Sequence, residues 1–229
     1  MKKYFVLLLL LLPGMFVGAQ DVKELLKKVK AKYDLVNDYT ATGKMKTNVI
    51  FIKAPVATVK VYYKKPDKLK IKNESGISFI PKGSVNINMN NVLGLNNFEA
   101  VAAGTEKING TECKIVKVFP ISDEENITRA TLYIDEKEML VLKSVISTKE
   151  NGTYELVMSY KTYKAWGLPD KVELTFNTRD YKLPKGITID YDNGSGKDNA
   201  DKAKEKKGKV EITYSNYVIN KGVPDSAFN

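Results

Sequence analysis

The sequence predicts a mainly β protein of the α+β class, in which an N-terminal helix precedes a long antiparallel meander. Apolar and polar residues alternate with a period of two from about Tyr39 to Tyr217, which is typical of strands with one buried and one solvated face. Turn-forming clusters such as Pro66-Asp67 and Asn109-Gly110 separate the alternating runs. About nine to eleven consecutive strands imply a strongly curved sheet or an open barrel.

The first residues, MKKYFVLLLLLLPGMFVGAQ, have the order of a secretory signal peptide. Basic Lys2 and Lys3 come first, an apolar run follows, and small residues end the segment. The apolar run is shorter than the about 20 residues that a permanent membrane span needs. We therefore predict cleavage after Ala19, so that residues 1–19 form a signal peptide and residues 20–229 form a single exported domain.

An amphipathic helix is expected at the start of this domain. Apolar residues recur there at the spacing of one helical face: Val22, Leu25, Leu26, Val29 and Tyr33. Asp21 and Glu24 fit an N-cap and its partner three residues later, which predicts a helix start at Asp21. Such a helix either plugs one face of the sheet or acts as a lid over a cavity, and the pattern alone favours the plug.

The strands are predicted where every second residue is apolar, at Val59–Tyr63, Leu69–Ile71, Val85–Met89, Ala130–Ile134, Tyr154–Tyr160, Val172–Phe176 and Val210–Tyr214. In the first two of these runs the intervening positions place four lysines on the solvated face: Lys60, Lys68, Lys70 and Lys72. Cys113, the single cysteine, has no partner for an internal disulfide and is expected to pack as a small apolar residue in a strand.

Two segments break the alternation. Asn90–Gly104 is apolar without a period and predicts a short helix or an irregular loop, either a mobile cover or a buried connection. Asp192–Lys209 contains no large apolar residue, so it buries too little surface to offset its ordering entropy. Residues 192–209 are therefore predicted to be a flexible hairpin loop.

The residue types of the chain argue against catalysis. It contains no histidine and one cysteine, which removes the usual general base and the commonest metal ligands. Acidic groups at Asp123–Glu125 and Asp135–Glu136 lie at turn-like positions with lysines nearby, and we interpret them as solvated turn residues rather than as a glycosidase pair. We predict no catalytic residue, no metal site, no cofactor and no enzymatic activity.

The charge of the chain is basic, with 37 Lys and Arg residues against 27 Asp and Glu residues and a net charge of +10. Arginine, whose planar fork reads bases and phosphates, is present only at Arg129 and Arg179. Lysine is the ordinary residue of solvated surfaces. A nucleic-acid partner is therefore not expected.

Three stretches of the chain carry a resemblance to a known family. After the N-terminal helix, Lys64-Lys65-Pro66 is followed by Leu69-Lys70-Ile71, which is similar to the opening of the LolA family of periplasmic lipoprotein carriers. Thr131–Leu174 resembles its central part, in which Ile-Asp starts a turn and Leu-Pro opens a later strand. The end of the chain, VINKGVPDSAFN, is similar to the family's closing segment. The resemblance covers most of residues 20–229, although each motif is short.

The resemblance implies an unclosed antiparallel β-barrel of about eleven strands, with helices covering the opening of an apolar cavity. The residues that would line this cavity are Val59, Val61, Tyr63, Leu69, Ile71, Phe79, Ile87, Met89, Leu93 and Phe98. Lys65 occupies the position of a family arginine that holds the lid closed, and we assign it as a lid latch. Lysine lacks the planar fork of arginine, so this latch would differ from that of the family.

The function that the resemblance implies is that of a periplasmic carrier in a Gram-negative bacterium. It would bind lipoprotein acyl chains or lipids as a monomer and move them toward the outer membrane. Its further partners would be an inner-membrane release complex and an outer-membrane acceptor. The alternatives are a lipid-sensing regulator of envelope stress, a structural envelope protein of the same fold and, least favoured, an envelope glycan hydrolase.

Overall fold

The protein is described by a computed structural model that covers residues 17–49, 52–53, 56–76, 92–94, 97–122, 124–177 and 207–229. One α-helix, α1, and two short 3-10 helices, η2 and η5, accompany a single sheet within these residues. The helices are α1 (Val17–Tyr33), η2 (Lys164–Trp166) and η5 (Asp225–Phe228). The strands are β1 (Asp38–Val49), β2 (Ile52–Lys53), β3 (Ala57–Lys64), β4 (Lys68–Ser75), β5 (Phe98–Ile108), β6 (Thr111–Pro120), β7 (Ile127–Asp135), β8 (Leu140–Thr148), β9 (Gly152–Ser159), β10 (Lys171–Asn177) and β11 (Lys207–Ile219).

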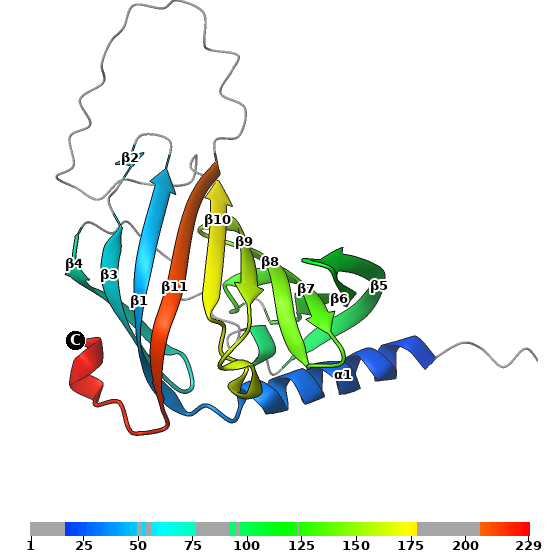
Figure 1. Ribbon diagram of the computed structural model, residues 1–229. Coiled ribbons are helices and arrows are strands. Elements are labelled where there is room, and N and C mark those ends of the chain that lie inside the picture. The colour runs from blue at the N-terminus through cyan, green and yellow to red at the C-terminus, as the bar shows by residue number, and fades with distance from the viewer. Residues whose placement is uncertain are drawn as a thin grey trace, which may run out of the picture.

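The strands form one antiparallel sheet in the order β4-β3-β1-β11-β10-β9-β8-β7-β6-β5, and β2 pairs with β1. Ten residue pairs join β1 and β11, the first and last strands of the chain, which are neighbours in this order. The two edge strands of the sheet, β4 and β5, follow one another in the chain. Within the described residues no pairing joins them, so the sheet curves into an unclosed barrel (Figure 1). The predicted fold class is confirmed.

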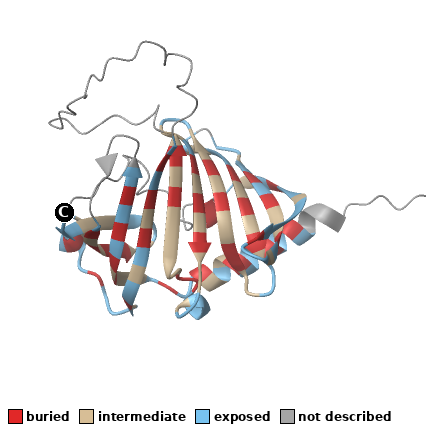
Figure 2. Ribbon diagram, turned by 45° about the horizontal axis from the view of Figure 1, so that its top comes forward, coloured by how far each residue is buried: buried red, intermediate tan, exposed pale blue. Residues whose placement is uncertain are grey.

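One side of the sheet, which we call the inner face, carries the buried residues of the alternating strands. In β3, Val59, Val61 and Tyr63 are buried, while the residues between them are partly exposed. The same two-residue period continues through β7 and β9, and Figure 2 shows it as alternating red and tan bands. Because side chains alternate between the two faces of a strand, the inner face is continuous from β3 across the sheet.

Helix α1 runs along one end of the sheet and packs against β5, β8 and η2 (Figure 1). Its predicted apolar face is confirmed, since Val22, Leu25, Leu26, Val29 and Tyr33 are all buried in the core. The predicted start at Asp21 is wrong, because the helix already begins at Val17. Asp21 therefore lies inside the helix, and its carboxylate instead accepts a hydrogen bond from Lys114 in β6 at 2.9 Å.

The prediction for Asn90–Gly104 is wrong in its second half, because Phe98–Gly104 belongs to strand β5. The alternation is hidden there for two reasons. β5 lies at the edge of the sheet and buries only Ala100 and Ile108, and its pairing with β6 shifts register between Ala102 and Thr105.

The structure describes only part of the rest of Asn90–Gly104 and of the predicted hairpin loop. Val92 and Leu93 are buried and lie in a helical turn, which agrees with the predicted short helix and not with the irregular loop. Lys207–Lys209, at the end of the predicted hairpin loop, already belong to β11. The rest of that loop, 192–206, and the predicted strand Val85–Met89 lie outside the described residues.

Candidate functional site

The inner face is the candidate site, because it gathers the described residues of the predicted cavity lining. Val59, Val61 and Tyr63 of β3 are exposed by 2% or less. Ile71 and Leu69 of β4 lie opposite Val61 and Tyr63 in register and pack against the same core.

The remaining predicted lining residues fall into two groups. Leu93 is buried in the helical turn, and half-buried Phe98 opens β5 and packs against the core. Phe79, Ile87 and Met89 lie outside the described residues. That these residues enclose a cavity for a ligand stays a prediction.

The inner face extends well beyond the residues named from the sequence. It continues across β7 to β11, where the strands contribute large buried side chains: Leu132, Ile134, Ile146, Leu156, Met158, Leu174, Phe176, Val210 and Ile212. The alternation that predicted these strands already marked their apolar positions. The predicted lining left them out because it was confined to the segment from Val59 to Phe98.

One polar side chain interrupts this apolar surface. Ser144 of β8 has no exposed surface and lies between Leu132 of β7 and Leu156 of β9 in register. Its Oγ is the one buried side-chain oxygen or nitrogen without a hydrogen-bond partner in the described part of the chain. Its position in the run LVLKSVIST gave the only sequence signal, a serine where the period requires an apolar residue.

A pair of tyrosine hydroxyl groups connects α1 to the sheet. The hydroxyl oxygens of Tyr33 in α1 and Tyr160 are 2.8 Å apart. Tyr160 also donates to the carbonyl oxygen of Val141 in β8 at 3.0 Å. Burial raises the pKa of Tyr33 to about 12, although its hydrogen bonds to Tyr160 and Val141 act in the opposite direction. Both hydroxyl groups therefore stay neutral at physiological pH, and α1 is held to β8 by polar as well as apolar contacts.

Five further tyrosines form an aromatic cluster at the end of the inner face where β1 begins. Tyr39 stacks on Tyr63 with ring centroids 5.2 Å apart, and Tyr217 meets Tyr39, Tyr163 and Tyr214 at 4.8 to 5.3 Å. The Tyr217 hydroxyl donates to the carbonyl oxygen of Pro169 at 2.7 Å. This cluster joins strands β1, β3 and β11, so it gives that end of the barrel a rigid aromatic wall.

The predicted latch residue, Lys65, contacts the end of α1. Its Nζ donates to the backbone oxygen of Asp34 at 2.7 Å and lies 3.2 Å from the Asp34 carboxylate. Burial disfavours ionised Asp34, but hydrogen bonds and charges from Lys30 and Lys65 outweigh it and lower the pKa of that carboxyl group. The backbone N–H of Lys65 also donates to the carbonyl oxygen of Asn37, just before β1. Lys65 thus ties the β3–β4 turn to the segment where α1 ends.

The lysines of β3 and β4 do more than solvate the outer face. Lys64 and Lys68 both bind the carboxylate of Asp225, at 3.1 and 3.0 Å. Lys70 donates to the backbone oxygens of Phe228 and Asn229. The predicted solvated face is therefore partly covered by η5, a contact between distant parts of the chain that periodicity does not reveal.

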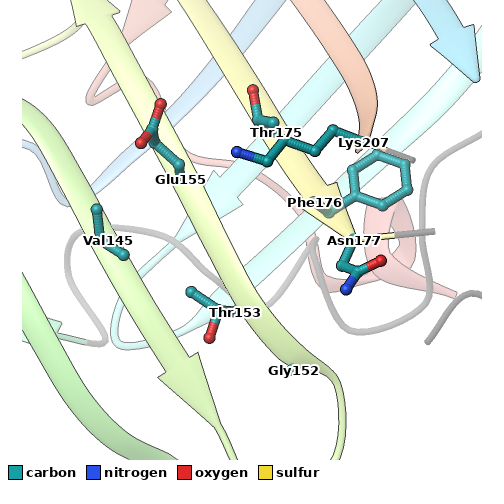
Figure 3. Close-up of a pocket in the computed structure, with 8 residues that line it drawn as sticks. All are labelled: Val145, Gly152, Thr153, Glu155, Thr175, Phe176, Asn177 and Lys207. Atoms are coloured by element: carbon teal, nitrogen blue, oxygen red, sulfur yellow. The ribbon is translucent and has the colours of Figure 1, made fainter. Parts of the chain in front are cut away.

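A cavity of about 440 Å³ lies on the outer side of the sheet, near one end of β8, β9 and β10 (Figure 3). It contains none of the seven described residues of the predicted lining. Its wall mixes hydroxyl, carboxylate, amine and apolar groups, from Val145, Gly152, Thr153, Glu155, Thr175, Phe176, Asn177 and Lys207. Glu155 is held by Lys143 at 3.3 Å. An acyl chain in this outer cavity would meet polar as well as apolar groups, whereas the inner face is almost entirely apolar.

The acidic turns of the chain serve local structure in the described residues. One carboxylate oxygen of Asp135 accepts hydrogen bonds from the backbone N–H groups of Lys137 and Glu138 at 3.0 and 3.2 Å. Glu136 pairs with Lys114 at 3.3 Å. Across the described ranges, no three His, Cys, Asp or Glu residues gather as metal ligands would. No helix of those ranges combines the length and apolar character of a membrane span.

The unclosed meander with α1 along one end is a LolA-like fold, as three solved structures demonstrate. A domain from Vibrio parahaemolyticus named for outer membrane lipoprotein sorting superposes with a TM-score of 0.57 at 13% identity, over 92% of this chain and 97% of that one. A LolA superfamily protein from Nitrosomonas europaea gives 0.55 at 11% identity, over 93% and 98%. A DUF1329 family protein from Desulfovibrio piger gives 0.54 at 15% identity, over 91% and 97%.

The likeness is one of fold. No protein-family model matches the chain, and no curated protein matches its sequence. At identities of 11 to 15% over nearly the whole chain, most side chains differ although the backbones superpose. What the inner face binds therefore depends on the side chains of this protein.

Proposed function

We propose that this protein is an extracytoplasmic carrier that shelters lipoprotein acyl chains or lipids against its inner face. The observation that carries the proposal is the continuous apolar inner face of an unclosed sheet. Burying a guest methylene there contributes about 0.8 kcal/mol, so a 14-carbon chain contributes on the order of 10 kcal/mol before ordering costs. Such binding requires no catalytic group and no cofactor.

The open side of the barrel supplies a route for the guest. β4 and β5 are the unpaired edges in the described residues, and the chain between them includes the apolar helical turn at Val92 and Leu93. Separation of the turn at Val92 and Leu93 or of α1 from the sheet would admit a chain without breaking the ladder of the other strands. Lys65 would act as the latch, because its Nζ contacts Asp34, the residue that follows α1.

The wider role follows from the predicted signal peptide, residues 1–19. Cleavage after Ala19 would remove the first three residues of α1, so the helix of the mature protein would begin at Gln20. With residues 1–19 removed as a signal peptide, the carrier would work in the periplasm of a Gram-negative bacterium. It would take its cargo from an inner-membrane release complex and deliver it to an outer-membrane acceptor. A water-filled compartment between two membranes requires such a shield, because exposed acyl chains associate with any apolar surface.

The test is purification without detergent, followed by native mass spectrometry and titration with a fluorescent fatty-acid probe. We expect bound lipid and saturable probe binding, and Leu156→Gln on the inner face should weaken that binding severalfold. Val157→Gln is the matched control, since Val157 is the next residue of β9 and faces the opposite side. A consistently empty protein that fails to bind the probe would overturn the proposal.

A further inference from the structure

Ser144 stands out within the inner face because of what surrounds it. It is the middle residue of β8, it has no exposed surface, and both of its neighbours in register are leucines. Its hydroxyl lacks a partner although buried polar groups are otherwise satisfied across the described residues. An unpaired buried hydroxyl destabilises a protein, and an alanine at this position would avoid that cost.

We propose, building on the carrier function above, that Ser144 is a ligand-binding residue whose O–H donates a hydrogen bond to the carbonyl oxygen of an acyl ester or amide. A plain hydrocarbon would leave the hydroxyl as unsatisfied as it is in the ligand-free protein. A carbonyl oxygen would accept its proton in surroundings without water, where a hydrogen bond is strengthened. The inner face would then distinguish acylated molecules from other apolar ones.

The depth of Ser144 defines how the guest is bound. Four residues separate it from each end of β8, so at about 3.4 Å per residue its Cα lies about 14 Å from either end of the strand. A carbonyl group at that depth places the acyl linkage inside the barrel rather than at its rim. The apolar positions around it, Leu132, Ile146 and Leu156, would contact the chain on both sides of the linkage.

α1 meets β8 on the N-terminal side of Ser144. The helix packs against β8, and the Tyr33 hydroxyl accepts a hydrogen bond from the Val141 N–H at 3.5 Å, three residues before Ser144. Withdrawal of α1 would open the inner face from this end of β8, and a guest chain that enters there would reach Ser144. The Ser144 hydroxyl would then donate to the guest carbonyl, an interaction that no described residue of α1 makes with it in the ligand-free protein.

The experiment compares two ligands that differ only in the carbonyl: 1-hexadecanoyl glycerol, an ester, and 1-O-hexadecyl glycerol, its ether analogue. Affinities are measured by displacement of a fluorescent fatty-acid probe from the wild type, Ser144→Ala and Ser147→Ala. Ser147 is the control, since it lies on the same strand, is partly exposed and is hydrogen-bonded to Thr153 at 3.0 Å. Thermal unfolding of the ligand-free variants is recorded in parallel.

We expect the wild type to prefer the ester, and Ser144→Ala to lose about three- to tenfold in ester affinity with no change for the ether. Ser144→Ala should unfold at the same or a higher temperature, because the unpaired donor is gone. Equal losses for both ligands, unchanged ester affinity, or a marked fall in unfolding temperature would each overturn the role of Ser144. Failure of the wild type to bind either ligand would instead refute the carrier function.

A glyceryl ester can come from a lipoprotein or from a phospholipid. Wild-type affinities for a diacylglyceryl-cysteine peptide and for phosphatidylglycerol separate these sources. Sensitivity to Ser144→Ala with only one of the two assigns the carbonyl to that source. Sensitivity with both supports recognition of the acylglycerol itself, and sensitivity with neither contradicts the proposal.

Discussion

Removal of the Lys65 amine tests whether this residue holds α1 in place. In Lys65→Ala the Asp34 backbone oxygen loses a donor at 2.7 Å and its carboxylate loses a partner at 3.2 Å. The Lys65 side chain is 30% exposed and that of Asp34 is 42% exposed, so solvent screens the pair. A partly exposed ion pair with one charge-assisted hydrogen bond contributes about 1 kcal/mol, which corresponds to about a fivefold change in an opening equilibrium.

Hydrogen exchange read by mass spectrometry follows this opening directly. We expect amides in the second half of α1 to exchange about fivefold faster in Lys65→Ala, while those of β7 to β9 keep the wild-type rate. Lys60→Ala is the matched control. Lys60 belongs to the same β3–β4 hairpin as Lys65, but its amine lies over the Tyr62 ring and not at the end of α1. Unchanged exchange in α1, or an equal increase in the control, would refute the assignment of Lys65 as a latch.

Four further predictions follow from single contacts. Gly208→Ala would place a Cβ 2.5 Å from the ring of Phe176 and should cost about 1 to 3 kcal/mol in urea unfolding, with part of it restored by adding Phe176→Leu. Because burial raises the pKa of Tyr33 from its usual 10.0 to about 12, the contribution of neutral Tyr33 to stability should be complete below pH 10 and be lost between pH 10 and 12. The alkaline fall in stability should be less steep in Tyr33→Phe, and a flat alkaline profile in the wild type would contradict this. The lowered pKa of Asp34 predicts a loss of stability at acid pH. The stabilisation from ionised Asp34 is complete above pH 3.8 and is lost as pH falls through the pKa of the folded protein. Asp34→Asn should therefore abolish the acid-induced change in the hydrogen exchange of α1. Asp225→Asn should speed proteolysis near η5 without altering probe binding, because its ion pairs lie on the outer face, and unchanged proteolysis would show that Asp225 does not anchor η5.

Periodicity predicted most of the fold correctly, because each well-buried strand has one apolar side. In β3, Val59 to Tyr63 alternate with polar neighbours, and the structure buries the apolar set as expected. The same rule failed for Phe98–Gly104, since an edge strand with a register shift buries few of its side chains. It also misplaced the start of α1, because a favourable N-cap residue such as Asp21 does not stop a helix from continuing toward the N-terminus.

The candidate site was predictable only in part, since several of its contacts join distant segments. The apolar residues of β3 and β4 follow from their alternation, and the latch position of Lys65 followed from a resemblance. Its actual partner, Asp34, depends on how the helix end meets the β3–β4 turn, which no local pattern encodes. The coverage of Lys68 and Lys70 by η5 likewise joins strand β4 to residues more than 150 positions later.

The central claim, that the inner face binds acyl chains, is tested most directly by photo-crosslinking. The detergent-free protein would be incubated with a palmitate analogue carrying a terminal diazirine, irradiated, and analysed by mass spectrometry at residue level. The account predicts labels on inward-facing residues of β3, β7 and β9, such as Val61, Leu132 and Leu156, and competition by unlabelled palmitate. Labels confined to the outer cavity at Val145 and Thr153, or no competed label at all, would contradict it.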